Sequence, residues 1–340
     1  MDQNNKKVDN QKRLTISDVA NALGVSKSTV SRTLSGNGRI SEATRKRILQ
    51  YIKEHNYTPN FIAKSLAESK TFNIAAVIPG DYNLVDLPFF QECMIGISEY
   101  ASSQNYDVFM CICYEDDMSQ LQRIVENHKV DGVILTRTLF DDKKEQYLLE
   151  KKVPFATIGT SINKEVIQVD NDHREACKEM TSYLIMKGFR RIGLIGGSET
   201  HIVTLNRYRG YEDAHKEHGL SVDKQIVYMN AQNSITIEKY AMELVKQDVD
   251  VIVCMDDSIC TNVLKVFKKE GIKVPQDIKL ASYFNSTMLE NRTPSITTLQ
   301  FNIKELGIEA CRALFSRING DMNCSKIIKK YEVILKESTK

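Results

Sequence analysis

Hydrophobic positions recur with two different spacings along this chain of 340 residues. Between residues 14 and 58 they lie three and four positions apart, which is the spacing of short amphipathic helices. After Phe72, apolar runs of strand length alternate with helix-length segments, which favours βαβ units and parallel sheets. The pattern therefore predicts a small helical head and a larger α/β body.

Three helices are expected in the head, residues 14–58. Thr15 can cap the first helix, and Gly24 permits its end. Ser26 can cap a second helix after a connection of only two residues, and the third begins at Ser41. The inward positions of the three helices are Ile16, Val19, Ala20 and Leu23 in the first, Val30 and Leu34 in the second, and Ile48, Tyr51 and Ile52 in the third.

The second helix has a short polar face, with Lys27, Ser28, Ser31 and Arg32 directed outward. Two helices joined by a tight glycine turn and braced by a third form a helix-turn-helix, whose second helix enters the major groove of DNA. Arg32 has the reach for guanine O6 and N7, and Thr29 and Ser31 have the length for phosphate oxygens. This face predicts a DNA-binding head.

The distribution of charge supports that prediction, although the overall net charge is only +2. Residues 1–70 hold 13 Lys and Arg against 6 Asp and Glu, a net charge of +7, whereas residues 71–340 hold 33 against 38, a net charge of −5. A basic head on an acidic body fits a head that meets a polyanion. Residues 1–13 are expected to be a disordered polar tail.

Residues 59–70 connect the head to the body. Pro59 ends the preceding helix, and Ile62, Ala63 and Leu66 then fall along one face of a segment too short to be a stable helix alone. An ordinary linker would contain more Gly, Ser or Pro and no apolar spacing. We therefore expect a conditional helix that acts as a switch between the two parts.

The head and hinge resemble those of the lactose/galactose repressor (LacI) family over the stretch LTISDVANALGVSKSTVSRTLSGNGRISEATRKRILQYIKEHNYTPNFIAKSLA. The resemblance extends over essentially the whole chain. It implies a homodimeric transcription regulator, usually a repressor, that binds a near-palindromic double-stranded DNA operator and is controlled by a small molecule. It also implies that the hinge helices fold on the operator and push a leucine, matched by Leu66, into the minor groove. The DNA contacts then expected are Thr15, Ser26, Lys27, Ser28, Thr29, Ser31, Arg32, Tyr57, Asn60, Ile62, Ala63 and Leu66.

The body, residues 71–340, contains two successive sets of strands and helices. Strands such as FNIAAVI, YDVFMCIC, GVILT and PFATIG belong to the first set, and RRIGLIGG, QIVYMN, DVIVCM and IKLASY to the second. Two sets predict two lobes, with ligands bound in a cleft at the carboxyl ends of the strands. The family shares this body with periplasmic sugar-binding proteins, and it implies three crossings between the lobes. The expected lobes are about 71–170 plus 301–323, and 171–300 plus 324–337.

Family motifs in the body indicate which residues would bind the effector, which the resemblance implies is a sugar or a derivative. Arg207, in RYRGY, matches the cleft arginine of the family, although Arg209 would replace it if the helix were rotated. Asp257 matches the cleft aspartate. Phe89 and Phe90, in LPFF, match the segment that lies over the ligand, and Phe90 fits the core as well as the cleft. The rim positions expected to join them are Tyr283 and Asn285.

The pocket rim departs from the family pattern, whereas the head does not. The usual Gly-aromatic-Asp-Asp sequence reads SYFN at 282–285, the usual Asn-Asp pair is Asp256-Asp257, and Arg174 replaces a glycine. The identity of the effector therefore cannot be carried over from any familiar member. Control of the body by a protein corepressor is the alternative that these departures leave open.

Several other classes of protein are disfavoured by composition. The eight cysteines have no CxxC spacing and no nearby histidine pairs, so free thiols of a reducing compartment are expected. Neither a secretory signal nor a membrane-length apolar run is visible, which argues against a solute-binding transport protein and favours a cytoplasmic protein without membrane contact. GLIGGSET lacks the spacing of a phosphate loop, and no GxSxG or HExxH motif occurs, so no enzyme activity, metal or cofactor is expected.

Overall fold

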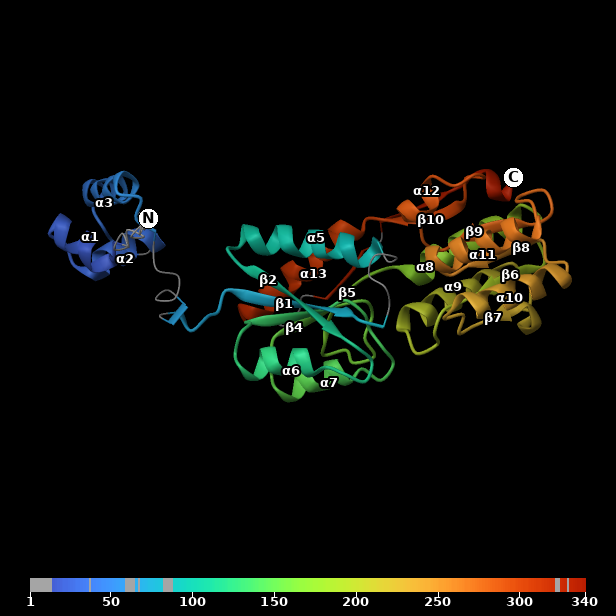
Figure 1. The fold of residues 1–340 in the computed structure, drawn as a ribbon, viewed down its shortest axis with the longest axis horizontal. Coiled ribbons are helices and arrows are strands. Elements are labelled where there is room, and N and C mark those ends of the chain that lie inside the picture. The colour runs from blue at the N-terminus through green and yellow to red at the C-terminus, as the bar shows by residue number, and fades with distance from the viewer. Residues whose placement is uncertain are drawn as a thin grey trace, which may run out of the picture. The chain divides into compact units, whose positions relative to one another are not determined.

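The computed structural model describes residues 14–36, 38–58, 65–66, 68–81, 88–321, 325–328 and 330–340. The chain separates into two compact units, residues 1–70 and residues 71–340, whose elements are labelled in Figure 1. This division falls at the position where the sequence pattern changes from the hinge to the body. The expectations for the tail, residues 1–13, and for Pro59, Asn60, Ile62 and Ala63 of the hinge lie outside the described residues.

The head consists of three short helices, α1 (Ile16–Leu23), α2 (Lys27–Ser35) and α3 (Glu42–Glu54). Thr15 and Asp18 form a capping box at the start of α1, and Gly24 ends that helix in the left-handed conformation with φ 61°. Ser26 caps α2, since its hydroxyl accepts a hydrogen bond of 3.1 Å from the amide of Thr29. The buried core of the head consists of Val19, Ala20, Val30, Ile48 and Tyr57.

Two six-stranded sheets form the centre of the body in the described part of the chain. The first has the order β11-β5-β4-β3-β1-β2, and all of its pairs are parallel. The second has the order β7-β6-β8-β9-β10-β12, in which β12 alone is antiparallel to its neighbour. The strands are β1 (Asn73–Pro79), β2 (Asp107–Cys113), β3 (Gly132–Leu135), β4 (Phe155–Ile158), β5 (Ile167–Asn171), β6 (Ile192–Ile195), β7 (Val227–Tyr228), β8 (Val251–Cys254), β9 (Lys279–Ser282), β10 (Thr297–Phe301), β11 (Lys326–Ile328) and β12 (Tyr331–Ile334).

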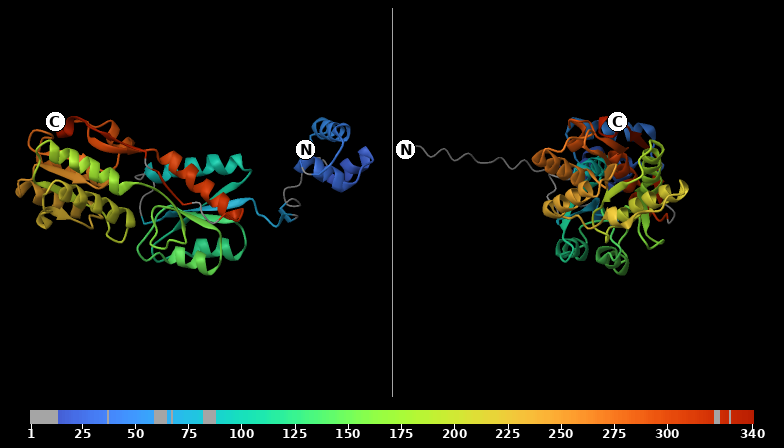
Figure 2. Two further views of the ribbon diagram at one scale, coloured as in Figure 1. Left: turned by 180° about the vertical axis from the view of Figure 1, so that it is seen from behind. Right: turned by 90° about the vertical axis from the view of Figure 1, so that its right-hand side faces the viewer.

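Helices cover both faces of each sheet, as Figures 1 and 2 show. In the first lobe, α5 and α13 pack together on one face, and α6 and α7 lie on the other. In the second lobe, α8 packs on α9, and α10 packs on α11. The helices are α5 (Pro88–Ser103), α6 (Ser119–Glu126), α7 (Lys143–Glu150), α8 (His173–Met186), α9 (Ile202–Glu217), α10 (Ser234–Lys246), α11 (Asp257–Glu270), α12 (Thr287–Glu290) and α13 (Ile303–Ile318), with short 3-10 turns η2 (Lys224–Ile226) and η3 (Glu337–Thr339). Among the described residues, no helix is long and apolar enough to span a membrane.

The contact between α8 and α9 explains two features of the sequence. A Cβ atom at Gly210 would lie 2.3 Å from the carbonyl oxygen of Arg174, so this approach requires glycine. Arg174, which replaces a glycine of the family pattern, reaches across to α9 and donates two hydrogen bonds to the carboxylate of Asp213. The substitution is therefore accommodated on the surface of the helix pair.

The chain crosses between the lobes three times, after β5, between β10 and α13, and between β11 and β12. The expected boundary at residue 324 is wrong. β11 pairs with β5 of the first sheet, where Lys326 lies opposite Val169, so residues 326–328 belong to the first lobe. Three residues are too few for a hydrophobic pattern to assign such a strand to one lobe or the other.

Candidate functional site

The polar face predicted for α2 is exposed on the head. Lys27, Ser28, Ser31 and Arg32 are all exposed, whereas Val30 on the opposite side is completely buried. Three hydroxyl groups gather where this helix begins, because Ser26 Oγ lies 2.7 Å from Ser28 Oγ and 2.8 Å from Thr29 Oγ1. Hydroxyls and free amides at a helix N-terminus are suited to phosphate oxygens.

Two further positions predicted to contact DNA have different surroundings. Tyr57 is only 6% exposed and packs in the core of the head, so it contributes to the stability of the three helices. A DNA contact by Tyr57 stays a prediction. Leu66 is 83% exposed, which is unusual for a leucine and leaves its side chain available to another molecule.

A cavity of about 330 Å³ lies between the two lobes of the body. Its walls come from the carboxyl ends of parallel strands in both sheets, which is where ligands bind in folds of this type. From the first lobe come Phe89, Phe90, Thr136, Arg137, Thr138, Ile158, Gly159 and Asp170; from the second come Gly197, Ser198, His201, Val203, Thr204, Arg207, Ala231, Gln232, Asn233, Ser234, Ile237, Asp256, Asp257, Ser258, Ile259, Asn262 and Phe284.

The lobes also contact one another directly beside this cavity. The amide of Phe140 donates a hydrogen bond of 2.9 Å to the carbonyl of Thr200, and the amide of Ile202 donates one of 3.4 Å to the carbonyl of Thr138. Leu139 and His201 form an isolated β-bridge at the same place. These backbone contacts hold the two lobes together at the edge of the cavity.

Arg207 projects from α9 into the cavity and is the central cation of the site. Its side chain is buried, with the residue 9% exposed, and Nη1 donates a hydrogen bond of 2.6 Å to the carbonyl of Met255. Its Nε is buried and has no hydrogen-bond acceptor among the residues that the structure describes, and its guanidinium lies 5.9 Å from the centre of the Phe284 ring. Arg209, the alternative from sequence, is exposed on the other side of α9 and does not line the cavity.

Three carboxyl groups lie around the guanidinium of Arg207, and a second guanidinium, that of Arg137, lines the cavity from the first lobe. Burial raises the pKa of Asp170 and the pKa of Asp256 to about 6, and the neighbouring Asp257 adds to the shift of Asp256. Burial also raises the pKa of Asp257, whose carboxylate accepts a hydrogen bond from Ser286. The charged groups that line the cavity are thus three carboxyl groups and two guanidinium groups, and a ligand with several hydroxyl groups finds both acceptors and donors there. Among the described residues, no cluster of His, Cys, Asp and Glu is placed to hold a metal ion.

Aromatic rings form the apolar part of the cavity wall. Phe89 and Phe90 stand edge to face with their ring centres 5.2 Å apart, and Phe89 also lies 6.1 Å from Phe284. Flat aromatic surface next to hydrogen-bonding groups is typical of pockets for small cyclic molecules.

The structure does not bring the two predicted rim residues to the cavity. Tyr283 is completely buried in the core and its hydroxyl pairs with that of Thr181. Asn285 is buried and donates a hydrogen bond of 2.5 Å to the side chain of Gln300. Both predictions are therefore corrected, and Phe284, between them, supplies the ring that lines the cavity.

Sequence reasoning also missed Asp170, Asp256 and the run Thr136–Thr138, all of which line the cavity. Each of these residues follows a buried strand or lies at its end. In the sequence, a polar residue directly after an apolar run would have marked these positions as candidates for the site.

The comparisons with known proteins agree with this architecture. Residues 15–60 match the family described as bacterial regulatory proteins, lacI family, and residues 71–334 match periplasmic binding proteins and sugar binding domain of LacI family. The chain belongs to the LacI family. It is thus a DNA-binding transcriptional regulator, as the polar face of α2 indicates.

The similarity also covers almost the whole length of individual relatives. The chain is 33% identical over 301 residues to the HTH-type transcriptional regulator MalR of Streptococcus pneumoniae, covering 84% of this chain and 92% of MalR. A structure of the transcriptional regulator CelR in complex with cellobiose is similar with a TM-score of 0.73 and 27% identity, over 96% of this chain and 100% of that one. The lac repressor dimer bound to operator shares the fold, with a TM-score of 0.78 and 19% identity over 96% of this chain and 99% of that one.

Proposed function

We propose that this LacI-family member is a repressor that binds a two-fold symmetric operator as a homodimer and responds to a carbohydrate in the cavity between its lobes. The observation that carries the proposal is a preformed cavity in which three aromatic rings, a buried guanidinium and three carboxyl groups converge. Sugar hydroxyls both donate and accept hydrogen bonds, and their apolar ring faces stack on aromatic side chains. As a regulator of DNA it would act in the cytoplasm.

The relatives support a carbohydrate over other small molecules. CelR has been crystallised with cellobiose, and its fold covers almost all of this chain. A relative in Staphylococcus xylosus is named catabolite control protein A, at 26% identity over 96% of this chain. The size and polarity of the cavity favour a small molecule over a protein corepressor as the main input.

The first lobe offers a surface for the second copy of the chain. β2 is the edge strand of its sheet and exposes Phe109 and Met110, and Ile95 is exposed on α5, which packs beside β2. Exposed apolar side chains on an edge strand are typical of an interface. We expect Met110→Glu to shift the protein towards monomer in analytical ultracentrifugation, whereas Met186→Glu, at an exposed methionine of α8, should not.

The effector would act through the relative position of the lobes. A ligand that contacts both walls favours one arrangement of the lobes over the other, by as much as its affinities for the two arrangements differ. Through the hinge that arrangement would determine whether Leu66 reaches the minor groove, since a folded hinge helix is required to hold it there.

The test combines selection of DNA with a matched pair of arginine variants. Selection from a random duplex pool should return an inverted repeat, and calorimetry with a panel of mono- and disaccharides should identify a ligand. Arg207→Met should then lose most of the affinity for that ligand, whereas Arg209→Met, two positions along the same helix, should retain it. Retained binding in Arg207→Met would contradict the assignment of the site, and the absence of heat with every sugar would favour a protein corepressor.

A further inference from the structure

The charged side chains that line the cavity between the lobes do not balance one another. Three are carboxyl groups and two are guanidinium groups, namely Asp170, Asp256, Asp257, Arg137 and Arg207. Where each of these charges finds a partner inside the protein, no charge is left for a ligand. We therefore follow the charges one at a time, beginning with the first lobe.

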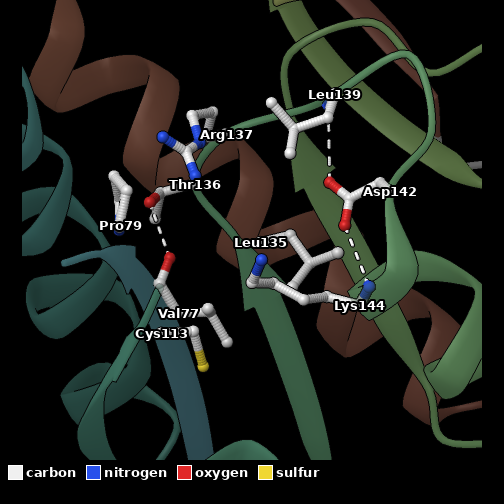
Figure 3. A pocket seen from close by; sticks show the side chains of 9 residues that line it. All are labelled: Val77, Pro79, Cys113, Leu135, Thr136, Arg137, Leu139, Asp142 and Lys144. Carbon is white, nitrogen blue, oxygen red and sulfur yellow. Dashed lines mark hydrogen bonds between the residues drawn. The ribbon is translucent and has the colours of Figure 1, made fainter. Parts of the chain in front are cut away.

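Arg137 has its partner in the first lobe. Its Nη2 lies 3.0 Å from Oδ2 of Asp81, and its side chain is only 13% exposed. Figure 3 shows Arg137 on the segment after β3, together with the other side chains that line a small cavity of that lobe. Across from it, burial and then the charge of Arg137 lower the pKa of His201 to about 4, so this imidazole is uncharged at pH 7. The pair of Arg137 and Asp81 is therefore electrically neutral.

Arg207 does not neutralise the three carboxylates. The residue is only 9% exposed, and among the described residues its guanidinium donates to the carbonyl of Met255 and forms no ion pair, while its Nε has no acceptor. Asp170 has the ring of His173 at 3.5 Å, but burial holds the pKa of that imidazole well below its usual value, so the ring carries no charge. One positive charge thus stands against three negative ones, a net charge of −2 at this end of the cavity.

Asp256 supplies one of these negative charges where the family pattern has asparagine, and it is partly exposed to the cavity. Its Oδ1 accepts a hydrogen bond of 2.7 Å from the amide of Ile259 and so caps α11. Its Oδ2 lies over Gly197, where a Cβ atom would be 4.0 Å from Oδ2 and 3.7 Å from Oγ1 of Thr204. A carboxylate oxygen and a hydroxyl thus converge beside a glycine, with no side chain between them and a ligand.

The adjacent carboxylates of Asp256 and Asp257 disfavour one another when both are ionised. Burial, and after it the charge of Asp257, raise the pKa of Asp256 to about 6. A positive charge within a few ångströms favours the ionised form of such a group, whereas a neutral hydroxyl leaves the repulsion in place. A ligand group that carries a positive charge therefore interacts more favourably with this part of the cavity than a hydroxyl does.

We propose that the effector is a carbohydrate that carries an ammonium group, and that Asp256 is the residue that selects it. This inference rests on the proposed function and specifies which carbohydrates the cavity takes. The ammonium group donates hydrogen bonds to Oδ2 of Asp256 and to the hydroxyl of Thr204, beside Gly197. Hydrogen bonds between two charged groups are about twice as strong as those between neutral ones, and this difference separates an amino sugar from its parent.

The experiment compares matched sugars by calorimetry with the full chain at pH 7. Glucose, galactose and mannose are each measured beside glucosamine, galactosamine and mannosamine, and 6-amino-6-deoxyglucose is included for a second position of the amine. The N-acetylated form of each amine keeps the nitrogen atom and removes its charge. We expect at least one amine to bind about tenfold more tightly than both its parent sugar and its N-acetylated form.

Asp256→Asn separates the charge of this residue from its shape. Asparagine caps a helix as well as aspartate does, so α11 should keep its start and the protein its circular dichroism spectrum. The preference for the amine over its parent should be lost in this variant. Asp223→Asn makes the same change at an exposed residue that caps the turn η2 outside the cavity, and it should keep the preference.

Two results would overturn this inference and leave the proposed function in place. One is a neutral sugar that binds as tightly as its amine, which is measured on the unsubstituted chain and does not depend on any variant. The other is an Asp256→Asn protein that retains the preference for the amine. The absence of heat with every sugar, charged or neutral, would overturn the proposed function as well.

Discussion

The head and the body place their functional side chains in opposite environments. In the head, a small buried core supports an exposed polar face on α2, so the core residues differ from those proposed to contact DNA, apart from the caps Thr15 and Ser26. In the body, Arg207, Asp170 and Asp257 are buried, and the groups that would bind an effector are also part of the packed interior. Substitutions should therefore separate folding from function in the head and should couple them in the body.

The largest effect is expected from the core of the head. Ile48→Ala removes a completely buried side chain from a cluster with few members, and we expect a loss of about 2–5 kcal/mol in the stability of the head. Calorimetry should show the transition of the head lowered or lost while that of the body stays in place. The adjacent Leu49→Ala, at an exposed position, is the control. A matching shift of the body transition would show that the two units do not unfold independently.

In the body, a buried carboxyl group should make stability depend on pH. Burial raises the pKa of Asp170 from an ordinary value of 3.8 to about 6, so the folded state holds this proton more tightly than the unfolded chain. The contribution of Asp170 to the free energy of unfolding is complete below pH 3.8. On the order of 3 kcal/mol of that free energy is lost as the pH rises through about 6. Asp170→Asn should remove this part of the pH dependence in thermal unfolding.

Asp213 provides a control of opposite sign for that measurement. The hydrogen bonds that Arg174 donates hold the pKa of Asp213 below its usual range. The contribution of Asp213 to the free energy of unfolding is therefore lost as the pH falls. If Asp170→Asn and Asp213→Asn changed the pH profile in the same direction, the environment assigned to Asp170 would be wrong.

A smaller effect on DNA recognition is expected from the exposed face of α2. Arg32→Ala should cost about 1–3 kcal/mol in binding to the selected operator, since a bidentate contact with guanine is lost. Binding to random DNA at the same salt concentration should change much less. Lys46→Ala, at an exposed lysine of α3, serves as the comparison. An equal loss on both DNAs would make Arg32 a phosphate contact and not a reader of sequence.

The smallest effect concerns the helix cap of the head. Thr15→Ala removes the hydroxyl that pairs with Asp18 and should lower the stability of the head by about 1 kcal/mol. Thr15→Ser keeps the hydroxyl and should restore most of that stability in thermal unfolding. Failure of serine to restore it would assign the effect to the lost methyl group.

The sequence predicted the head in more detail than the body, for a local reason. Helix caps such as Thr15 and Ser26 act within four residues, so their signals are complete in one short stretch. Strands β5 and β10 were not predicted as strands, because strand formation there depends on pairing partners that are distant in the sequence.

The candidate effector site was predicted where a family motif marks a single residue, as at Arg207 and Asp257. It was mispredicted after β9, where Tyr283 enters the core and Phe284 the cavity. Because side chains alternate in extended backbone, an error of one position exchanges the two environments. Only the three-dimensional arrangement could identify that shift.

The late position of β11 and β12 matters while the chain is being made. A ribosome that has reached residue 300 has released every helix of the head but neither lobe in finished form, because α13, β11 and β12 are still to come. Loss of the C-terminal segment from Lys326 onward would remove an edge strand from each sheet at once and expose β5 and β10 in their place. The incomplete polypeptide on the ribosome would have a folded head but neither a finished effector cavity nor the helix α13 that supports α5 in the first lobe.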